Sequence, residues 1–233
     1  VVMGFEAGQN NQADDSILIG SEAGKGVTTG DQNVTIGHNA MWQATTSTQN
    51  TVIGGGAVGS NVAAGSDLTT GGENTFIGAS AGRAVTTASR MVVIGKDAAY
   101  KYNDTSGNNG KQVLIGYQAA YELTTGVYNT VLGYQAMYAA TTAGYNTVIG
   151  WYSGVSMTEG LQNTIVGYRA GDSMTDTLVI AKRIVSFIKT MKIDGLSIGI
   201  VKRLIENGYT TLDSILTITP EQLMEIEGFK ETL

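Results

Sequence analysis

The chain has 233 residues, a formal net charge of −6 at pH 7 and only 15% charged residues, whereas glycine occurs 32 times and proline once. The absence of cysteine excludes disulfides and thiolate metal sites, and the single histidine excludes a zinc site built on a histidine pair. No apolar run is long enough for a membrane helix and no basic-then-apolar leader opens the chain, so we expect no membrane insertion.

An aliphatic run that ends in glycine recurs ten times. The repeat glycines are Gly4, Gly20, Gly37, Gly54, Gly78, Gly95, Gly116, Gly133, Gly150 and Gly167. The steps between them are 16, 17, 17, 24, 17, 21, 17, 17 and 17 residues. A fixed short period is the signature of a solenoid. The two long steps indicate loops inserted near residues 61–67 and 103–110.

Each position of the repeat has a physical reading. Aligned on its glycine, the unit is Asn-Thr-Val-Ile-Gly-x-x-Ala, followed by a variable stretch that contains Thr-Thr-Gly. The β-branched residues predict a short strand, and the glycine lets the backbone bend or approach a neighbour. Asparagine and Thr-Thr-Gly are turn residues, and stacked asparagines can form amide ladders. We therefore predict coils with two short strands each, pairing at about 4.8 Å.

The repeat also suggests how many chains take part. Each coil carries one strongly apolar strand, so a single chain would leave one side uncovered and must find neighbours. Three chains around a common axis are the simplest solution. We expect the residue before each glycine to face that axis, which assigns the trimer core to Ile36, Ile53, Ile77, Ile94, Ile115, Leu132, Ile149 and Val166. The expected fold over residues 1–180 is all-β, a homotrimeric parallel β-roll or β-helix.

The pattern Asn-Thr-Val-Ile-Gly-Tyr-Gln-Ala-x-Tyr, clearest at Asn129–Tyr138 and Asn146–Tyr152, resembles the repeats of bacteriophage tail-fibre and appendage proteins. It is also similar to the repeats of trimeric autotransporter adhesin heads, whose motif has one more residue between asparagine and glycine. The first resemblance implies a homotrimeric stalk or receptor-binding segment of a virion, with other virion proteins and a host receptor or glycan as partners. The second implies a bacterial surface adhesin.

Aromatic residues recur at fixed places in the later repeats. Tyr117, Tyr134, Trp151 and Tyr168 directly follow the repeat glycine, and a second set consists of Tyr100, Tyr121 and Tyr138. Both sets predict columns of rings. Exposed rings can bind glycans by stacking, which makes the first set a candidate recognition surface. Packing between coils and between chains is the alternative.

Helical periodicity replaces the repeat after Ile180. One predicted helix has its apolar face at Ile184, Phe187, Ile188 and Met191, another at Ile200, Val201, Leu204 and Ile205, and a third begins after Thr219 at Pro220. The stretch from Lys192 to Gly228 resembles the helix-hairpin-helix region of NAD-dependent DNA ligases. That resemblance implies a small all-α domain over residues 181–233 and an alternative function in nucleic-acid binding.

The helix-hairpin-helix family binds DNA phosphate through a Gly-hydrophobic-Gly hairpin. Here the hairpins read Gly195-Leu196-Ser197 and Gly228-Phe229-Lys230, without the second glycine, so only a weak phosphate contact by Gly195, Ser197 and Lys202 is expected. Residues 181–233 hold seven basic and seven acidic side chains, a balance that argues against DNA as a partner. A helical cap or docking module, truncated at residue 233, is the preferred interpretation.

No catalytic, cofactor-binding or metal-ligating set emerges. Lys192-Ile193-Asp194-Gly195 matches the adenylation signature of ligases, but only 41 residues follow Lys192, too few for a nucleotidyltransferase domain. The repeat glycines lack the strand–turn–helix context of a nucleotide site. We therefore expect a non-enzymatic virion protein.

Overall fold

The structure is a computed structural model that describes residues 1–12, 15–57, 62–105, 110–171, 198–209, 214–215, 217–219, 222 and 225–226. The chain divides into two compact units, Val1–Asp172 and Ser173–Leu233. The first unit therefore ends slightly before residue 180, where the repeat pattern fades in the sequence.

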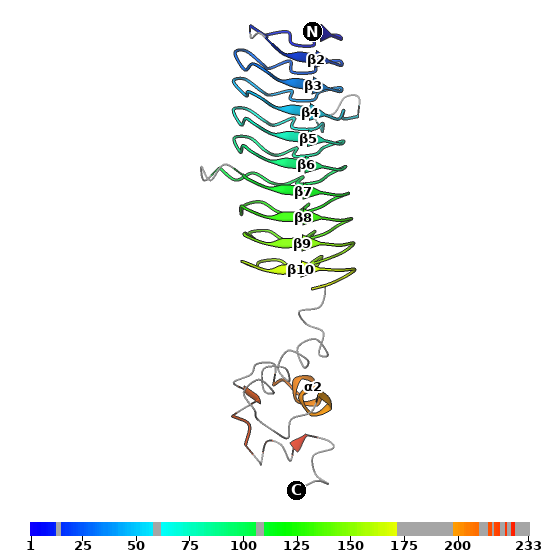
Figure 1. Cartoon of the computed structure of the whole chain (residues 1–233), viewed down its shortest axis with the longest axis vertical. Helices are drawn as coiled ribbons and strands as arrows, with labels where there is room; N and C mark the ends of the chain where they lie inside the picture. Colours follow the sequence, from blue (N-terminus) through cyan, green and yellow to red (C-terminus); the bar gives the residue numbers. More distant parts are fainter. Residues whose placement is uncertain are drawn as a thin grey trace. The chain divides into compact units, whose positions relative to one another are not determined.

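The first unit is a parallel β-solenoid. Its strands are β1 (Val2–Met3), β2 (Ile17–Ile19), β3 (Val34–Ile36), β4 (Thr51–Ile53), β5 (Thr75–Ile77), β6 (Val92–Ile94), β7 (Val113–Ile115), β8 (Thr130–Leu132), β9 (Thr147–Ile149) and β10 (Thr164–Val166). They form one ten-stranded sheet in chain order, stacked like rungs (Figure 1). Equivalent residues pair directly, as Val131 does with Val148. The predicted solenoid of 17-residue coils is confirmed.

Each coil has one strand among its described residues, not the two that we predicted. The rest of the coil still bonds to its neighbours through the backbone. Around one coil, the N–H groups of Ala120, Glu122 and Thr124 donate to carbonyl groups one coil further on, at 3.0, 3.0 and 2.9 Å. The backbone is therefore satisfied around the coil without a second strand.

The left-handed backbone explains why the other sides are not strands. In the coil that contains Gly116 (φ 138°), Lys111, Gln118 and Ala120 have φ values of 51°, 51° and 52°. The equivalent residues of most other coils are left-handed too. Such a conformation costs a non-glycine residue about 1 kcal/mol, and the hydrogen bonds between coils offset it.

Repeat glycines are required for close approach as well as for φ. A Cβ on Gly78 would lie 2.7 Å from the carbonyl carbon of Gly95 in the next coil. No side chain fits that space, so glycine stands wherever two coils pass each other directly after the strand.

A single chain fills its own core. The middle strand residue, the third residue after the glycine and the seventh after it all point inward. In the coil of Gly133 these are Val131, Ala136 and Ala140, each with no exposed surface. The preceding coil, that of Gly116, supplies Leu114, Ala119 and Leu123 at the same places, also fully buried. Because alanine is small, the side chain of the middle strand residue can fill the interior of its own coil up to the opposite side.

The residues assigned to a trimer core lie outside this single-chain core. Strand residues alternate in direction, so burial of Val148 turns Ile149 outward. The same holds for Ile36, Ile53, Ile77, Ile94, Ile115, Leu132 and Val166, all half-buried or exposed. The premise that one chain cannot cover its own coil was wrong, because alanine and the residue at the seventh position complete the core.

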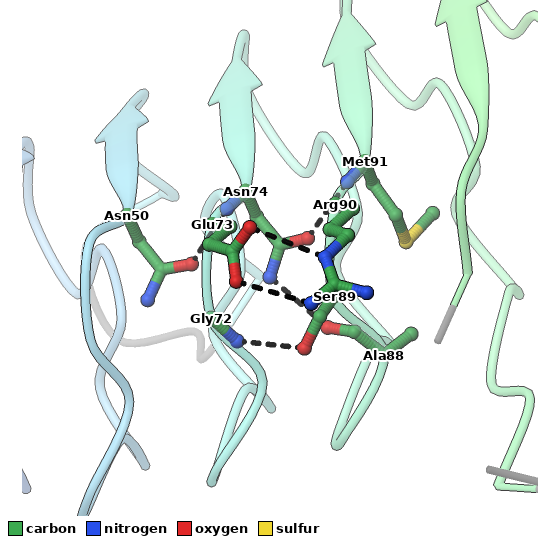
Figure 2. Close-up of polar contacts among 8 residues, drawn as sticks. All are labelled: Asn50, Gly72, Glu73, Asn74, Ala88, Ser89, Arg90 and Met91. Carbon is green, nitrogen blue, oxygen red and sulfur yellow. Dashed lines mark hydrogen bonds and ion pairs between the residues drawn. The ribbon is translucent and has the colours of Figure 1, made fainter. Parts of the chain in front are cut away.

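Asparagine side chains form the predicted ladder. Asn50 Oδ1 accepts from the backbone N–H of Asn74 at 3.0 Å, and Asn74 Oδ1 accepts from that of Met91 at 3.0 Å (Figure 2). Asn74 Nδ2 donates to the Ala88 carbonyl at 3.0 Å, across the turn of the next coil. Each buried amide thus ties the start of one strand to the coil that follows it.

The ladder changes at β6, where Met91 stands in place of asparagine and is fully buried. In the next coil Gln112 takes over: its Nε2 donates to the Gly126 carbonyl, and its Oε1 accepts from the Asn129 N–H at 3.0 Å. Tyr102 fills the adjacent core and donates to the same Gly126 carbonyl at 3.0 Å. Burial raises the pKa of Tyr102 to about 12.

The inserted residues lie somewhat differently from the prediction. In the first long coil, Ala64 N–H donates to the Gly54 carbonyl at 3.1 Å, and Gly65 N–H to that of Ala81 at 3.0 Å, so the regular path resumes at Ala64. The extra length therefore lies between Gly56 and Ala64 rather than at 61–67. In the second long coil, Asn103 occupies the position of a repeat threonine, and the inserted residues come after it.

The second unit contains helix α2 (Ile198–Glu206). Its predicted apolar face is confirmed, since Val201, Leu204 and Ile205 are buried. Gly208 (φ 95°) caps the helix beyond Glu206. The Tyr209 N–H donates to the Leu204 carbonyl and the Gly208 N–H to that of Ile205, both at 3.0 Å, which is a Schellman motif. The helix predicted around residues 184–191 lies outside the described residues.

One hydrogen-bond pair supports the third predicted helix start. Gln222 N–H donates to Thr219 Oγ1 at 3.3 Å and Thr219 N–H to Gln222 Oε1 at 2.9 Å, a reciprocal capping box. Pro220, Leu223 and Met224 are not among the described residues.

We expect Asn146→Ala to lower the free energy of unfolding by about 2–4 kcal/mol. The change removes bonds from Asn146 Nδ2 to Asn129 Oδ1 (3.0 Å) and to the Gly160 carbonyl (2.9 Å), and leaves the Asn163 N–H without its acceptor. The measurement is chemical denaturation at fixed protein concentration. The matched control is Gln43→Ala, an exposed amide, which should change the value by less than about 0.5 kcal/mol. Equal effects of the two substitutions would show that the ladder does not stabilise the coils.

Candidate recognition surface

The outward face of the parallel sheet is uniformly uncharged. The first and third residues of β2–β10 point out of the core, and none of them is ionisable. Several are widely exposed, among them Ile17 (38%), Leu132 (46%) and Val166 (61%). Most of the other outward residues are half-buried, so an uncharged, partly exposed face continues over the coils and is a candidate interaction surface.

The predicted column of Tyr100, Tyr121 and Tyr138 exists, and so does the start of the other predicted column, whereas Trp151 is tilted and Tyr168 is 72% exposed. Tyr100, Tyr121 and Tyr138 stack almost in parallel, with ring centroids 5.0 and 5.2 Å apart and planes within 7°. Tyr117 and Tyr134 stack at 5.1 Å and 16°. Rings in such stacks cover each other's faces, which confirms packing between coils as one role of these residues.

A third column escaped the sequence analysis. Tyr128 and Tyr145 stack at 4.9 Å and 22°, and they are 42% and 55% exposed. Both stand five residues before a repeat glycine, so the 17-residue period would have identified them.

Each column begins at a cation from the preceding coil. Arg83 lies 5.3 Å from the ring centroid of Tyr100, Lys96 lies 6.0 Å from that of Tyr117, and Lys111 lies 5.1 Å from that of Tyr128. Each cation occupies the same repeat position as the ring it covers. Cation–π attraction therefore continues the stacks into the charged early coils.

The early coils carry a different surface. Lys25 Nζ lies 2.6 Å from Glu6 and 3.3 Å from Glu22, and Trp42 Nε1 donates to Glu22 at 2.9 Å. The Trp42 and Lys25 contacts lower the pKa of Glu22, and the Glu6 contact raises the pKa of Lys25. The Lys25–Glu6 ion pair links the first two coils, and the Trp42–Glu22 hydrogen bond links the second coil to the third.

The residues predicted to make a weak phosphate contact are only partly described. Gly195 and Ser197 lie outside the described residues. Lys202 is on α2, where its Nζ lies 3.7 Å from Glu206 and its side chain is 49% exposed. An exposed lysine paired within its own helix remains free to exchange that partner for another anion.

Within the part of the chain that the structure describes, no helix is long and apolar enough to cross a membrane. Among the same residues, no three histidine, aspartate or glutamate side chains gather into a group that could hold a metal ion.

Comparison with known proteins gives one partial likeness. A stretch of 55 residues is 38% identical to a DNA ligase of Acanthamoeba polyphaga mimivirus, covering 24% of this chain and 9% of the ligase. The chain thus spans less than a tenth of that relative's length. No protein-family model and no solved structure matches the chain.

Proposed function

We propose that the chain is a non-enzymatic structural and adhesive segment of a phage virion appendage, a tail fibre or similar, in which three copies pack together as a stalk or receptor-binding region. The observation that carries the proposal is the uncharged outward face of β2–β10. Around a three-fold axis each residue meets its own copies, so any charge there would meet like charges. A face with no ionisable residue in nine coils satisfies that constraint.

The proposal changes the role of the residue before each repeat glycine. Ile149 and its equivalents do not build the core of a coil. They lie on a finished solenoid and would form the contact between solenoids. A bacterial surface adhesin with the same trimeric architecture is the alternative that shares this geometry.

Light scattering on the whole chain tests the assembly. We expect a mass of about three times 24.4 kDa. Ile149→Asp should give a folded monomer with an unchanged circular dichroism spectrum, because its carboxylate faces solvent once the copies separate. The matched variant Val148→Asp should unfold the neighbouring coils, since it places an unpaired carboxylate in the single-chain core at a cost of several kcal/mol. A folded wild-type monomer, or a trimeric Ile149→Asp variant, would contradict the proposal.

Nucleic-acid binding through the second unit is the second candidate, and the partial likeness to a DNA ligase favours it. Fluorescence anisotropy of the whole chain with a labelled DNA duplex at moderate salt separates the two. The appendage proposal predicts no saturable binding. Saturable, salt-dependent binding that is weakened by Lys202→Gln but not by the control Lys96→Gln, on the solenoid, would support the DNA candidate.

A further inference from the structure

Trp151 interrupts the regular stacking of its column. Tyr117 and Tyr134 stack at 16°, whereas Trp151 is tilted by 46° from Tyr134 at a centroid distance of 5.3 Å. The tilt uncovers part of the indole face, and Trp151 is 56% exposed. A partly exposed indole therefore follows the Tyr117–Tyr134 stack in this column, and Tyr168, the next residue of the column, is 72% exposed.

Neighbouring rings hold the indole in this orientation. Tyr152 packs edge-on against Tyr134 at 5.4 Å and 71°, and lies 6.2 Å from Trp151 at 31°. Burial and the contact with Tyr152 raise the pKa of Tyr134. Because two neighbouring tyrosines fix the indole, a ligand would lose little free energy in ordering it.

The surroundings select the class of ligand. The stretch 110–171 contains only four charged residues, Lys111, Glu122, Glu159 and Arg169. Its polar groups are chiefly hydroxyls and amides, such as the Gln118–Gln135 pair, which bonds at 2.7 Å. Nucleic acids and anionic polymers need a basic surface, which this stretch lacks. One of the four charged residues adjoins Trp151, since the Arg169 N–H donates to the Trp151 carbonyl at 2.9 Å. A ligand with an apolar C–H face and uncharged hydroxyl edges fits an exposed indole whose surroundings are chiefly hydroxyls and amides with a single arginine.

We propose that Trp151, oriented by Tyr134 and Tyr152, is a stacking platform for a pyranose ring of a neutral saccharide. The inference rests on the proposed function insofar as it names the class of receptor that the appendage would contact. The platform itself is built by one chain. Three copies in one assembly would strengthen a weak single contact through multivalency.

Tryptophan fluorescence tests the platform directly, since the chain has two tryptophans. In a Trp42→Phe background Trp151 is the sole reporter, and Trp42 lies in the early coils, bonded to Glu22. The probes are maltoheptaose, cellohexaose and chitohexaose. We expect at least one to shift the emission saturably and to protect Trp151 from acrylamide quenching. By calorimetry, Trp151→Ala should weaken binding at least about tenfold. The control Tyr138→Ala, in the other column, should bind as the wild type does.

Two results would overturn the saccharide platform. One is no protection by any of the three probes up to about 10 mM, the range of weak single-site contacts. The other is equal binding by Trp151→Ala. Light scattering on the same samples distinguishes failure of the saccharide platform from failure of the proposed trimer. A trimer that binds no saccharide refutes only the platform. A monomer that binds saccharide refutes only the trimer.

Discussion

The fixed register between successive coils is the constraint on which the rest of the structure depends. Each residue lies on its equivalent one coil away, so every property of a position is repeated along the solenoid. Repeat glycines permit the close approach after the strand, and buried asparagine amides fix the alignment before it. Left-handed residues elsewhere in the coil are tolerated because the same register pairs their backbone groups. A quasi-one-dimensional structure of this kind gains stability coil by coil.

Register also explains the division between core and surface. The middle residue of most strands is buried together with an alanine of its own coil, which leaves the flanking strand residues outside. Once aligned, residues that would be scattered on another fold become continuous columns: isoleucines, tyrosines, amides and ion pairs. The columns differ along the chain, with ion pairs around Lys25 in the early coils and aromatic stacks from Tyr100 onward. Assembly and recognition can therefore reside on different parts of one solenoid.

Sequence reasoning found the period, the aliphatic strand of each coil, the asparagine ladder, the column of Tyr100, Tyr121 and Tyr138, and helix α2. These follow from periodicity and from residue types with strong preferences. It also predicted a second strand per coil that the described residues do not contain. It missed that Ile149 points outward. Whether alanine is large enough to complete the core of a single coil depends on how far apart the sides of the coil lie, which the sequence does not reveal. It missed the left-handed residues, since Gln118, Ala120 and Lys111 have no intrinsic preference for positive φ and adopt it only through bonds between coils. The insertion between Gly56 and Ala64 was placed too late in the sequence analysis, because Leu68 is recognisable as a core residue only once the coils are aligned. The tilt of Trp151 depends on side-chain packing that the sequence does not reveal.

Engineered disulfides test the register most directly, because the chain has no cysteine of its own. Thr130 and Thr147 are direct partners on β8 and β9, on the outward face, at a strand spacing that a disulfide can bridge. The account predicts that Thr130→Cys/Thr147→Cys oxidises to an intramolecular disulfide without loss of fold. The control Thr130→Cys/Val148→Cys, whose side chains point to opposite faces, should stay reduced. A bridge in the control pair, or only intermolecular bridges in the first, would contradict a single-chain solenoid in this register.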